Sequence, residues 1–134
     1  MARSERGVAA GCGVVRWALQ LGKEDGGQVF RVGVVSDAFS GYTGCWPKHA
    51  WFFQDFCMVA GGQRQGDYID PPPFAAGDVV TFELERAPGV DSVLRVRVAG
   101  KIARELRGLP RDGVMYPIVG LFNKKQSITM VALP

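Results

Sequence analysis

The chain has 134 residues, of which 47% are hydrophobic and 22% charged, and its 16 Lys/Arg and 13 Asp/Glu give a formal net charge of +3. This length suits one domain with an ordinary hydrophobic core, and the composition excludes a disordered protein. No apolar run approaches the ~20 residues of a membrane-spanning helix, and none near Met1 predicts a secretory signal peptide.

Alternating apolar and polar residues predict strands in the first half of the chain. Residues 14–21 and 30–34 both alternate, and the glycine-containing turn at 23–27 predicts that they pair as a hairpin. Residues 36–48 have the composition of an ordered loop. The apolar stretch 50–59 predicts one or two short buried strands, followed by a loop tip at residues 61–66.

Further strands are predicted in the second half, at residues 79–85, 93–99, 115–122 and 127–133. Residues 102–106 are ambiguous between a short strand and a loop, and residues 102–109 are the one weak candidate for a short helix. Gly100 is expected to need a positive φ angle. Pro117 lies inside a predicted strand, which indicates an edge position or a bulge.

Many short strands with frequent turn signals predict an all-β fold, an antiparallel sandwich or barrel. We find no internal repeat and no linker long enough to separate two domains. We therefore expect one domain over residues 7–134, preceded over residues 1–6 by an N-terminal segment that is disordered or extraneous to the domain.

The order of these motifs resembles the SPRY domain. The strand pair at 14–21 and 30–35 is similar to the family's opening strands, and the Gly-Asp strand at 75–84 to its "GD.I" strand. Residues 93–100 are similar to its "ISF.VNG" strand and turn, and residues 116–122 to its "YPAVSL" strand. The resemblance covers residues 7–134 and implies a compact, concanavalin-like sandwich of two antiparallel sheets.

Two departures from the SPRY pattern stand out. Ala99 occupies the position before Gly100 where the family usually has Asn. Residues 42–56 keep only Trp51 of the usual Trp/Gly/Tyr-rich pattern, which bears on the choice of ligand. Trp51 itself is expected to fill the core.

The resemblance implies a non-enzymatic protein-interaction module, which serves as an adaptor, a scaffold or the substrate-recognition domain of a ligase. SPRY modules dock peptides or protein surfaces on loops at one end of the sandwich, partly on the loop after the "YP" strand. The aromatic-rich loop region offers further anchors, because Tyr and Trp are favoured at interface hot spots. Our candidate partner-binding residues are Tyr42, Trp46, Arg64, Phe122, Asn123, Lys124 and Lys125.

Charge is distributed unevenly along the chain. Residues 1–85 hold seven Lys/Arg and ten Asp/Glu, whereas residues 86–134 hold nine Lys/Arg and three Asp/Glu. The C-terminal part is therefore expected to attract an acidic partner. Lys124 and Lys125 likewise favour an acidic ligand. Glu83 and Glu85 share a strand face and are expected to be solvated.

An RNA-binding or acidic-partner-binding module is the alternative, using a basic patch of Arg95, Arg97, Arg104 and Arg107 with contributions from Arg86, Lys101 and Arg111. The competing interpretation is that these arginines only keep one face of a sheet solvated and bind nothing. A sugar-binding lectin is a third hypothesis, since related sandwiches bind glycans. A salt titration against oligonucleotide and a glycan array would separate the three.

Three cysteines, Cys12, Cys45 and Cys57, form an odd set without the spacing of a zinc site. They suggest a reducing intracellular compartment, the cytoplasm or nucleus, with the thiols as small apolar core residues. Cys45 lies four residues from His49, but nothing marks an oxyanion hole or an orienting acid. We expect no enzymatic activity, no metal, no small-molecule cofactor and no membrane partner.

Overall fold

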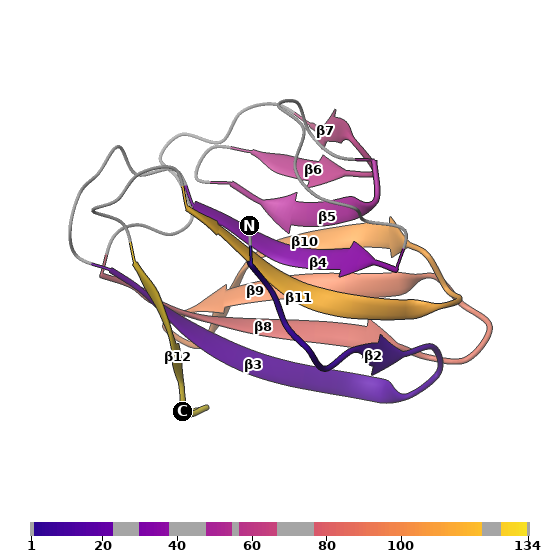
Figure 1. Cartoon of the computed structure of the whole chain (residues 1–134), viewed down its shortest axis with the longest axis horizontal. Helices are drawn as coiled ribbons and strands as arrows, with labels where there is room; N and C mark the ends of the chain where they lie inside the picture. Colours follow the sequence, from indigo (N-terminus) through magenta and orange to yellow (C-terminus); the bar gives the residue numbers. More distant parts are fainter. Residues whose placement is uncertain are drawn as a thin grey trace.

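The computed structural model describes residues 2–22, 30–37, 48–54, 57–66, 77–121 and 127–133. Over these residues it consists of strands and turns in two antiparallel sheets, which confirms the predicted all-β sandwich (Figure 1). Sheet A contains β1 (Ala2–Arg3), β2 (Val8–Ala9), β4 (Phe30–Ser36), β5 (Ala50–Phe53), β6 (Met58–Ala60), β7 (Gln63–Gln65) and β11 (Val114–Leu121). Sheet B contains β3 (Gly13–Leu21), β8 (Val79–Arg86), β9 (Ser92–Val98), β10 (Lys101–Leu109) and β12 (Ile128–Val131).

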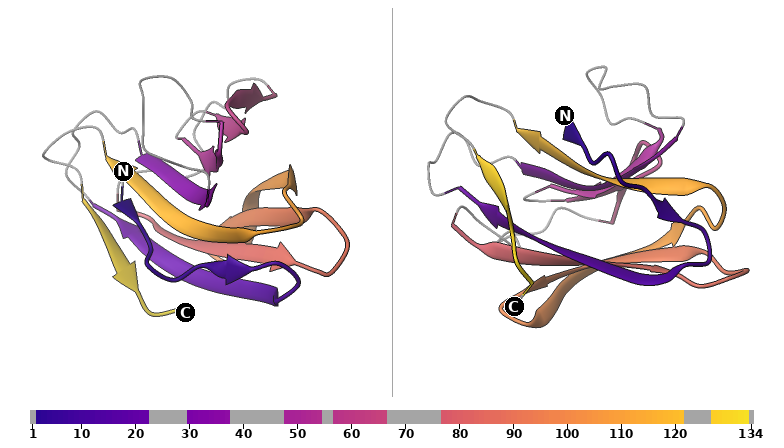
Figure 2. Two further views of the ribbon diagram at one scale, coloured as in Figure 1. Left: turned by 45° about the vertical axis from the view of Figure 1, so that its right-hand side comes forward. Right: turned by 60° about the horizontal axis from the view of Figure 1, so that its bottom comes forward.

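The strand order of sheet A is β1-β11-β4-β5-β6-β7, and β2 pairs with β11 as well. The order of sheet B is β10-β9-β8-β3-β12. The two sheets stack as layers, and Figure 2 shows them nearly edge-on. In the described part of the chain, no helix is long and apolar enough to cross a membrane.

The main core lies between the two sheets. Strand β3 turns Trp17, Leu19 and Leu21 inward, as its alternation predicts, and all three are buried. The Trp17 ring stacks on Phe82 of β8, with ring centroids 5.5 Å apart and an interplanar angle of 14°. Trp51 of β5 joins the same core, as expected from the sequence. Phe53 of β5 meets Phe82 from the other layer, with ring centroids 6.4 Å apart. This contact between the two sheets helps to set the separation of the layers.

A second apolar cluster lies on the face of sheet A that is turned away from the main core. Phe52, Val35 and Ile118 alternate with residues of the main core and are themselves buried. Gly33 lets strands β4 and β5 approach closely here, because a Cβ at Gly33 would lie 2.2 Å from the Trp51 carbonyl oxygen and 2.5 Å from the Phe52 Cα. Sheet A is therefore buried on both faces around β4 and β5.

Two expectations about the strands need correction, and one open alternative is decided. Strands β3 and β4 do not form a hairpin, because β3 pairs with β8 and β12 whereas β4 pairs with β11 and β5. The ambiguous segment 102–109 is a strand, β10, paired with β9. The supposed loop tip at 61–66 includes the short strand β7, whose three residues are all exposed.

Pro117 lies neither on an edge strand nor at a bulge, which corrects the expectation from the sequence: β11 runs between β1 and β4, and Pro117 pairs in regular register with Val34. The amide of Ser4 donates to the Pro117 carbonyl oxygen at 2.8 Å, so the backbone polar groups of Pro117 face the N-terminal segment rather than β4. On that side β11 meets only the two-residue strands β1 and β2 among the described residues. Residues 2 and 3 pair with β11, although the sequence places them outside the ordered domain.

Candidate functional site

Most of the predicted partner-binding residues lie outside the described residues. These are Tyr42, Trp46, Phe122, Asn123, Lys124 and Lys125. Arg64 is described: it lies exposed on β7, the outermost strand of sheet A, paired with Val59 of β6. The structure thus places one of the seven residues, and it also describes Leu121 and Ser127, the residues on either side of positions 122–126.

Both flanks of the segment 122–126 are fixed by strand pairing. On one side, Leu121 ends β11 and pairs with Phe30 of β4 in sheet A. On the other side, the carbonyl of Ser127 accepts a 2.7 Å hydrogen bond from the amide of Gly22, which follows β3 in sheet B. Leu121 thus belongs to sheet A, and Ser127 is bonded to the residue that follows β3 of sheet B.

A buried arginine supports the same end of sheet A. Arg31 pairs with Gly120 in register and is only 6% exposed. Its Nε donates to the Gln54 side-chain oxygen at 2.5 Å, and its guanidinium carbon lies 5.2 Å from the centroid of the Phe52 ring. The Gln54 side-chain amide in turn donates to the Cys57 sulfur at 3.3 Å. The sequence shows Arg31 only as a polar residue in an alternating strand, so its role could not be identified there.

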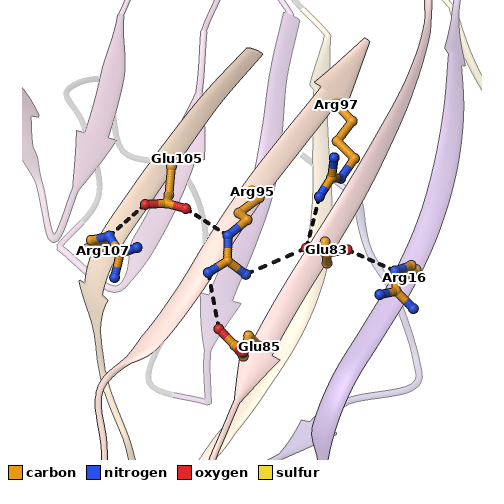
Figure 3. Close-up of polar contacts among 7 residues, drawn as sticks. All are labelled: Arg16, Glu83, Glu85, Arg95, Arg97, Glu105 and Arg107. Atoms are coloured by element: carbon orange, nitrogen blue, oxygen red, sulfur yellow. Dashed lines mark hydrogen bonds and ion pairs between the residues drawn. The ribbon is translucent and has the colours of Figure 1, made fainter. Parts of the chain in front are cut away.

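Three of the four arginines that define the proposed basic patch, Arg95, Arg97 and Arg107, belong to an ion-pair network on sheet B (Figure 3). Arg95 of β9 binds Glu105 of β10 at 2.7 Å and Glu85 of β8 at 3.1 Å, and reaches Glu83 at 3.5 Å. Glu83 also accepts from Arg16 of β3 at 2.8 Å, so that the network spans four neighbouring strands.

The remaining arginines of that patch extend the network or bond to the backbone. Arg97 lies 3.8 Å from Glu83, and Arg107 pairs with Glu105. Arg104 donates to the carbonyl of Ala103 at 2.7 Å. Most of the positive charge that the sequence indicates here is therefore compensated by glutamates of adjacent strands.

Glu83 is buried rather than solvated, which corrects the expectation from the sequence. The Glu83 side chain is 10% exposed at the centre of the network. The hydrogen bond from Arg16 lowers the pKa of Glu83 below its ordinary value, with burial acting in the opposite direction and nearby Arg97 and Arg95 adding to the lowering. The bond from Arg95 likewise lowers the pKa of Glu105. Both carboxylates are thus held in the charged state.

Arg86 does not contribute to a basic surface either, because it is completely buried. Its guanidinium donates to the Ser92 hydroxyl at 3.0 Å and to the carbonyls of Val8 and Gly113 at 2.6 and 2.8 Å. Further bonds reach the carbonyls of Pro110 and Asp112. Burial lowers the pKa of Arg86. This side chain ties the end of β8 to β2 and to the turn between β10 and β11.

The two described cysteines differ in their exposure to solvent. Cys57 is buried, as the sequence predicts, but Cys12 is exposed beside the turn that precedes β3. Cys45 lies outside the described residues. Among the described residues, no group of three or more His, Cys, Asp and Glu side chains could hold a metal ion.

Comparison with known proteins supports the fold. No protein-family model matches the sequence. No curated protein matches it. The structure is similar to the SPRY domain of human HERC1, with a TM-score of 0.70, 17% identity, and coverage of 96% of this chain and 79% of that one. It is also similar to the TRIM65 PSpry domain, with a TM-score of 0.68, 12% identity, and coverage of 98% and 70%. The chain therefore has the SPRY-like fold that its motifs indicate.

Proposed function

We propose that the chain is a non-enzymatic protein-interaction module that binds a partner peptide or protein surface through loops at one end of the sandwich. The SPRY-like fold supports this function, together with the sequence motifs described above. In this proposal the module works intracellularly, as an adaptor, a scaffold or the substrate-recognition domain of a ligase.

The observation that carries the proposal is that the residues on both sides of positions 122–126 are held by backbone hydrogen bonds of the sheets. Leu121 belongs to the β11–β4 ladder of sheet A, and Ser127 is bonded to Gly22 beside sheet B. Because the two layers fix both flanks, less conformational freedom remains to be lost when a partner binds. A recognition loop on rigid elements binds more tightly than the same residues in a free chain.

Residue chemistry indicates the kind of partner. Lys124 and Lys125 bring two positive charges to this loop, which favours a partner with acidic groups. In the proposal, Tyr42 and Trp46 supply aromatic anchors, and Phe122 and Asn123 complete the contact surface. Arg64 on the outer strand of sheet A is the seventh proposed residue.

The test is a quantitative affinity capture from cell lysate with the wild-type domain and the double variant Trp46→Ala, Lys124→Glu. A matched control, Val90→Ala with Lys101→Glu, changes an exposed apolar and an exposed basic residue at turns of sheet B. We expect a defined set of proteins to be retained by the wild type and the control and lost by the double variant. Equal recovery of every protein by all three baits would overturn the proposed site.

A further inference from the structure

An apolar groove opens between the sheets at the edge where β12 lies. It consists of two adjoining pockets of about 210 and 370 Å³, which share Ser4, Trp17, Pro117 and Met130 in their walls. Ile128 and Met130 of β12 line the first pocket from sheet B, and Val119 of β11 lines it from sheet A. Met130 is 70% exposed, so a large apolar side chain is presented to solvent at the mouth of this groove.

Beside the groove, strand β12 also presents backbone N–H and C=O groups on an edge with which no described strand pairs. It pairs with β3 on one side, and no described residue pairs with it on the other. The Ser127 carbonyl bonds toward β3, and backbone direction alternates along a strand. The N–H and C=O groups of Thr129 therefore face β3, while those of Ile128 and Met130 face the open edge. An open edge of this kind can accept an added strand.

The charged residues that line the groove are all basic. Arg3 lines one pocket and Arg6 the other, and no Asp or Glu of the described residues is found in the walls of either pocket. The Arg3 guanidinium lies 4.3 Å from the centroid of the Tyr116 ring, which holds it beside β11. The groove thus combines an apolar floor, a free strand edge and a positively charged rim.

We propose that this edge binds an extended acidic peptide of another protein as an additional strand on β12. Alternate apolar side chains of the peptide would enter the groove beside Met130, and its carboxylates would face Arg3 and Arg6. A second copy of this chain is the weaker occupant, because its own β12 edge would bring apolar side chains without carboxylates for these arginines. This binding edge is separate from the loop site proposed above and goes beyond that function.

The probe is a fluorescent peptide in which Val alternates with Glu or Asp, and its binding is measured by anisotropy. A second peptide replaces the acidic residues by Lys. Two others carry N-methyl groups on all the valine amides or on all the acidic-residue amides. Because an added strand bonds through only one of its edges, one N-methylated peptide should lose binding and the other should retain it.

Variants of the domain test the same geometry. Met130→Pro removes an N–H that faces the open edge together with the Met130 side chain that lines both pockets, and it leaves the β3 ladder intact. It should weaken binding at least ~10-fold. Met130→Ala removes the side chain alone, so the further loss in Met130→Pro measures the contribution of the N–H. Arg3→Glu with Arg6→Glu should weaken binding of the acidic peptide and favour the Lys peptide. Thr129→Ala is the matched control, because its backbone groups face β3. Thermal melting verifies that each variant is folded, and Met130→Ala provides a second readout of the groove.

Several results would overturn the proposal. These are no binding of the acidic peptide, equal binding of the Lys peptide, or equal binding by folded Met130→Pro and Thr129→Ala. Sedimentation showing a dimer that Met130→Pro dissociates would identify a second copy as the occupant and overturn it as well. The loop variant Trp46→Ala, Lys124→Glu should bind the acidic peptide normally, so that failure of one site is distinguishable from failure of the other.

Discussion

The Nη1 of Arg86 donates a 2.6 Å hydrogen bond to the carbonyl oxygen of Val8, which joins the last residue of β8 in sheet B to the first residue of β2 in sheet A. The same guanidinium bonds to backbone carbonyls of the turn between β10 and β11. One buried cation therefore closes this end of the sandwich without any ion pair to a carboxylate among the described residues.

Arg86→Met should lower the free energy of unfolding by about 3–5 kcal/mol, because it leaves several buried carbonyl groups without donors. Urea denaturation followed by tryptophan fluorescence measures this loss. Arg111→Met is the control: Arg111 pairs with Asp91 at 3.0 Å, but both side chains are about half exposed, and the expected loss is below ~1 kcal/mol. Similar losses in the two variants would contradict the assigned role of Arg86.

The ion-pair network should make the domain less stable in acid. The pKa values of Glu83 and Glu105 are lowered in the folded state, so the unfolded chain takes up more protons as the pH falls below ~4.3. The stabilisation is fully present above that value and is lost as the pH falls through the folded pKa values. Urea denaturation between pH 7 and pH 3 measures the effect.

Glu83→Gln tests which carboxylate causes this acid dependence. The variant should be less stable at pH 7 and should lose less stability on acidification than the wild type does. Glu5→Gln removes one exposed carboxylate outside the network and serves as the matched control. An acid dependence that is the same in the wild type and in Glu83→Gln would show that Glu83 does not contribute.

Ala99→Asn should stabilise the domain by about 0.5–1 kcal/mol. Ala99 has a φ of 52° and Gly100 a φ of 78°, so both residues of the β9–β10 turn are left-handed, a conformation that Asn tolerates better than Ala. Calorimetry should show a higher melting temperature for Ala99→Asn. Gly100→Ala should have the opposite effect, and a lower melting temperature for Ala99→Asn would contradict the strain assigned to Ala99.

Gly33→Ala should destabilise the domain by about 1–3 kcal/mol, because the added methyl meets the backbone of Trp51 and Phe52 rather than a movable side chain. Gly89→Ala provides the comparison: its φ is 74° but a Cβ there meets nothing within 4 Å, so only the backbone cost of about 1 kcal/mol applies. Denaturant midpoints of the two variants measure the difference. A smaller loss in Gly33→Ala than in Gly89→Ala would exclude the steric explanation.

Strand positions could be predicted from the sequence, but strand partners could not. Trp17 on β3 and Val32 on β4 both face the core, although the two strands lie in opposite sheets. Two strands show the same alternation of apolar and polar residues whether they pair within one sheet or face each other across the core, so the pattern does not reveal the partner. Pairing β3 with β4 as a hairpin was therefore wrong. Strand β7 was missed because all three of its residues are exposed and carry no apolar signal.

The charged residues illustrate a second limit of sequence reasoning. Glu83 looks like a solvated residue of an exposed strand face, and its burial depends on arginines that come from β3 and β9. Arg86 looks like part of a basic surface, and its partners lie as far as 78 positions away in the sequence. The groove beside β12 could not be predicted from the sequence, because its walls combine residues of β12 with residues of β11 and of the N-terminal segment.

The ion-pair network on sheet B also affects how copies of the protein meet one another. Glutamates and arginines alternate across β3, β8, β9 and β10, so a second copy stacked on this face would gain little and would have to desolvate charged groups. The face is thereby protected against lateral stacking into fibrils. At high ionic strength, screening weakens this protection, and colloidal stability of concentrated solutions should decline with added salt.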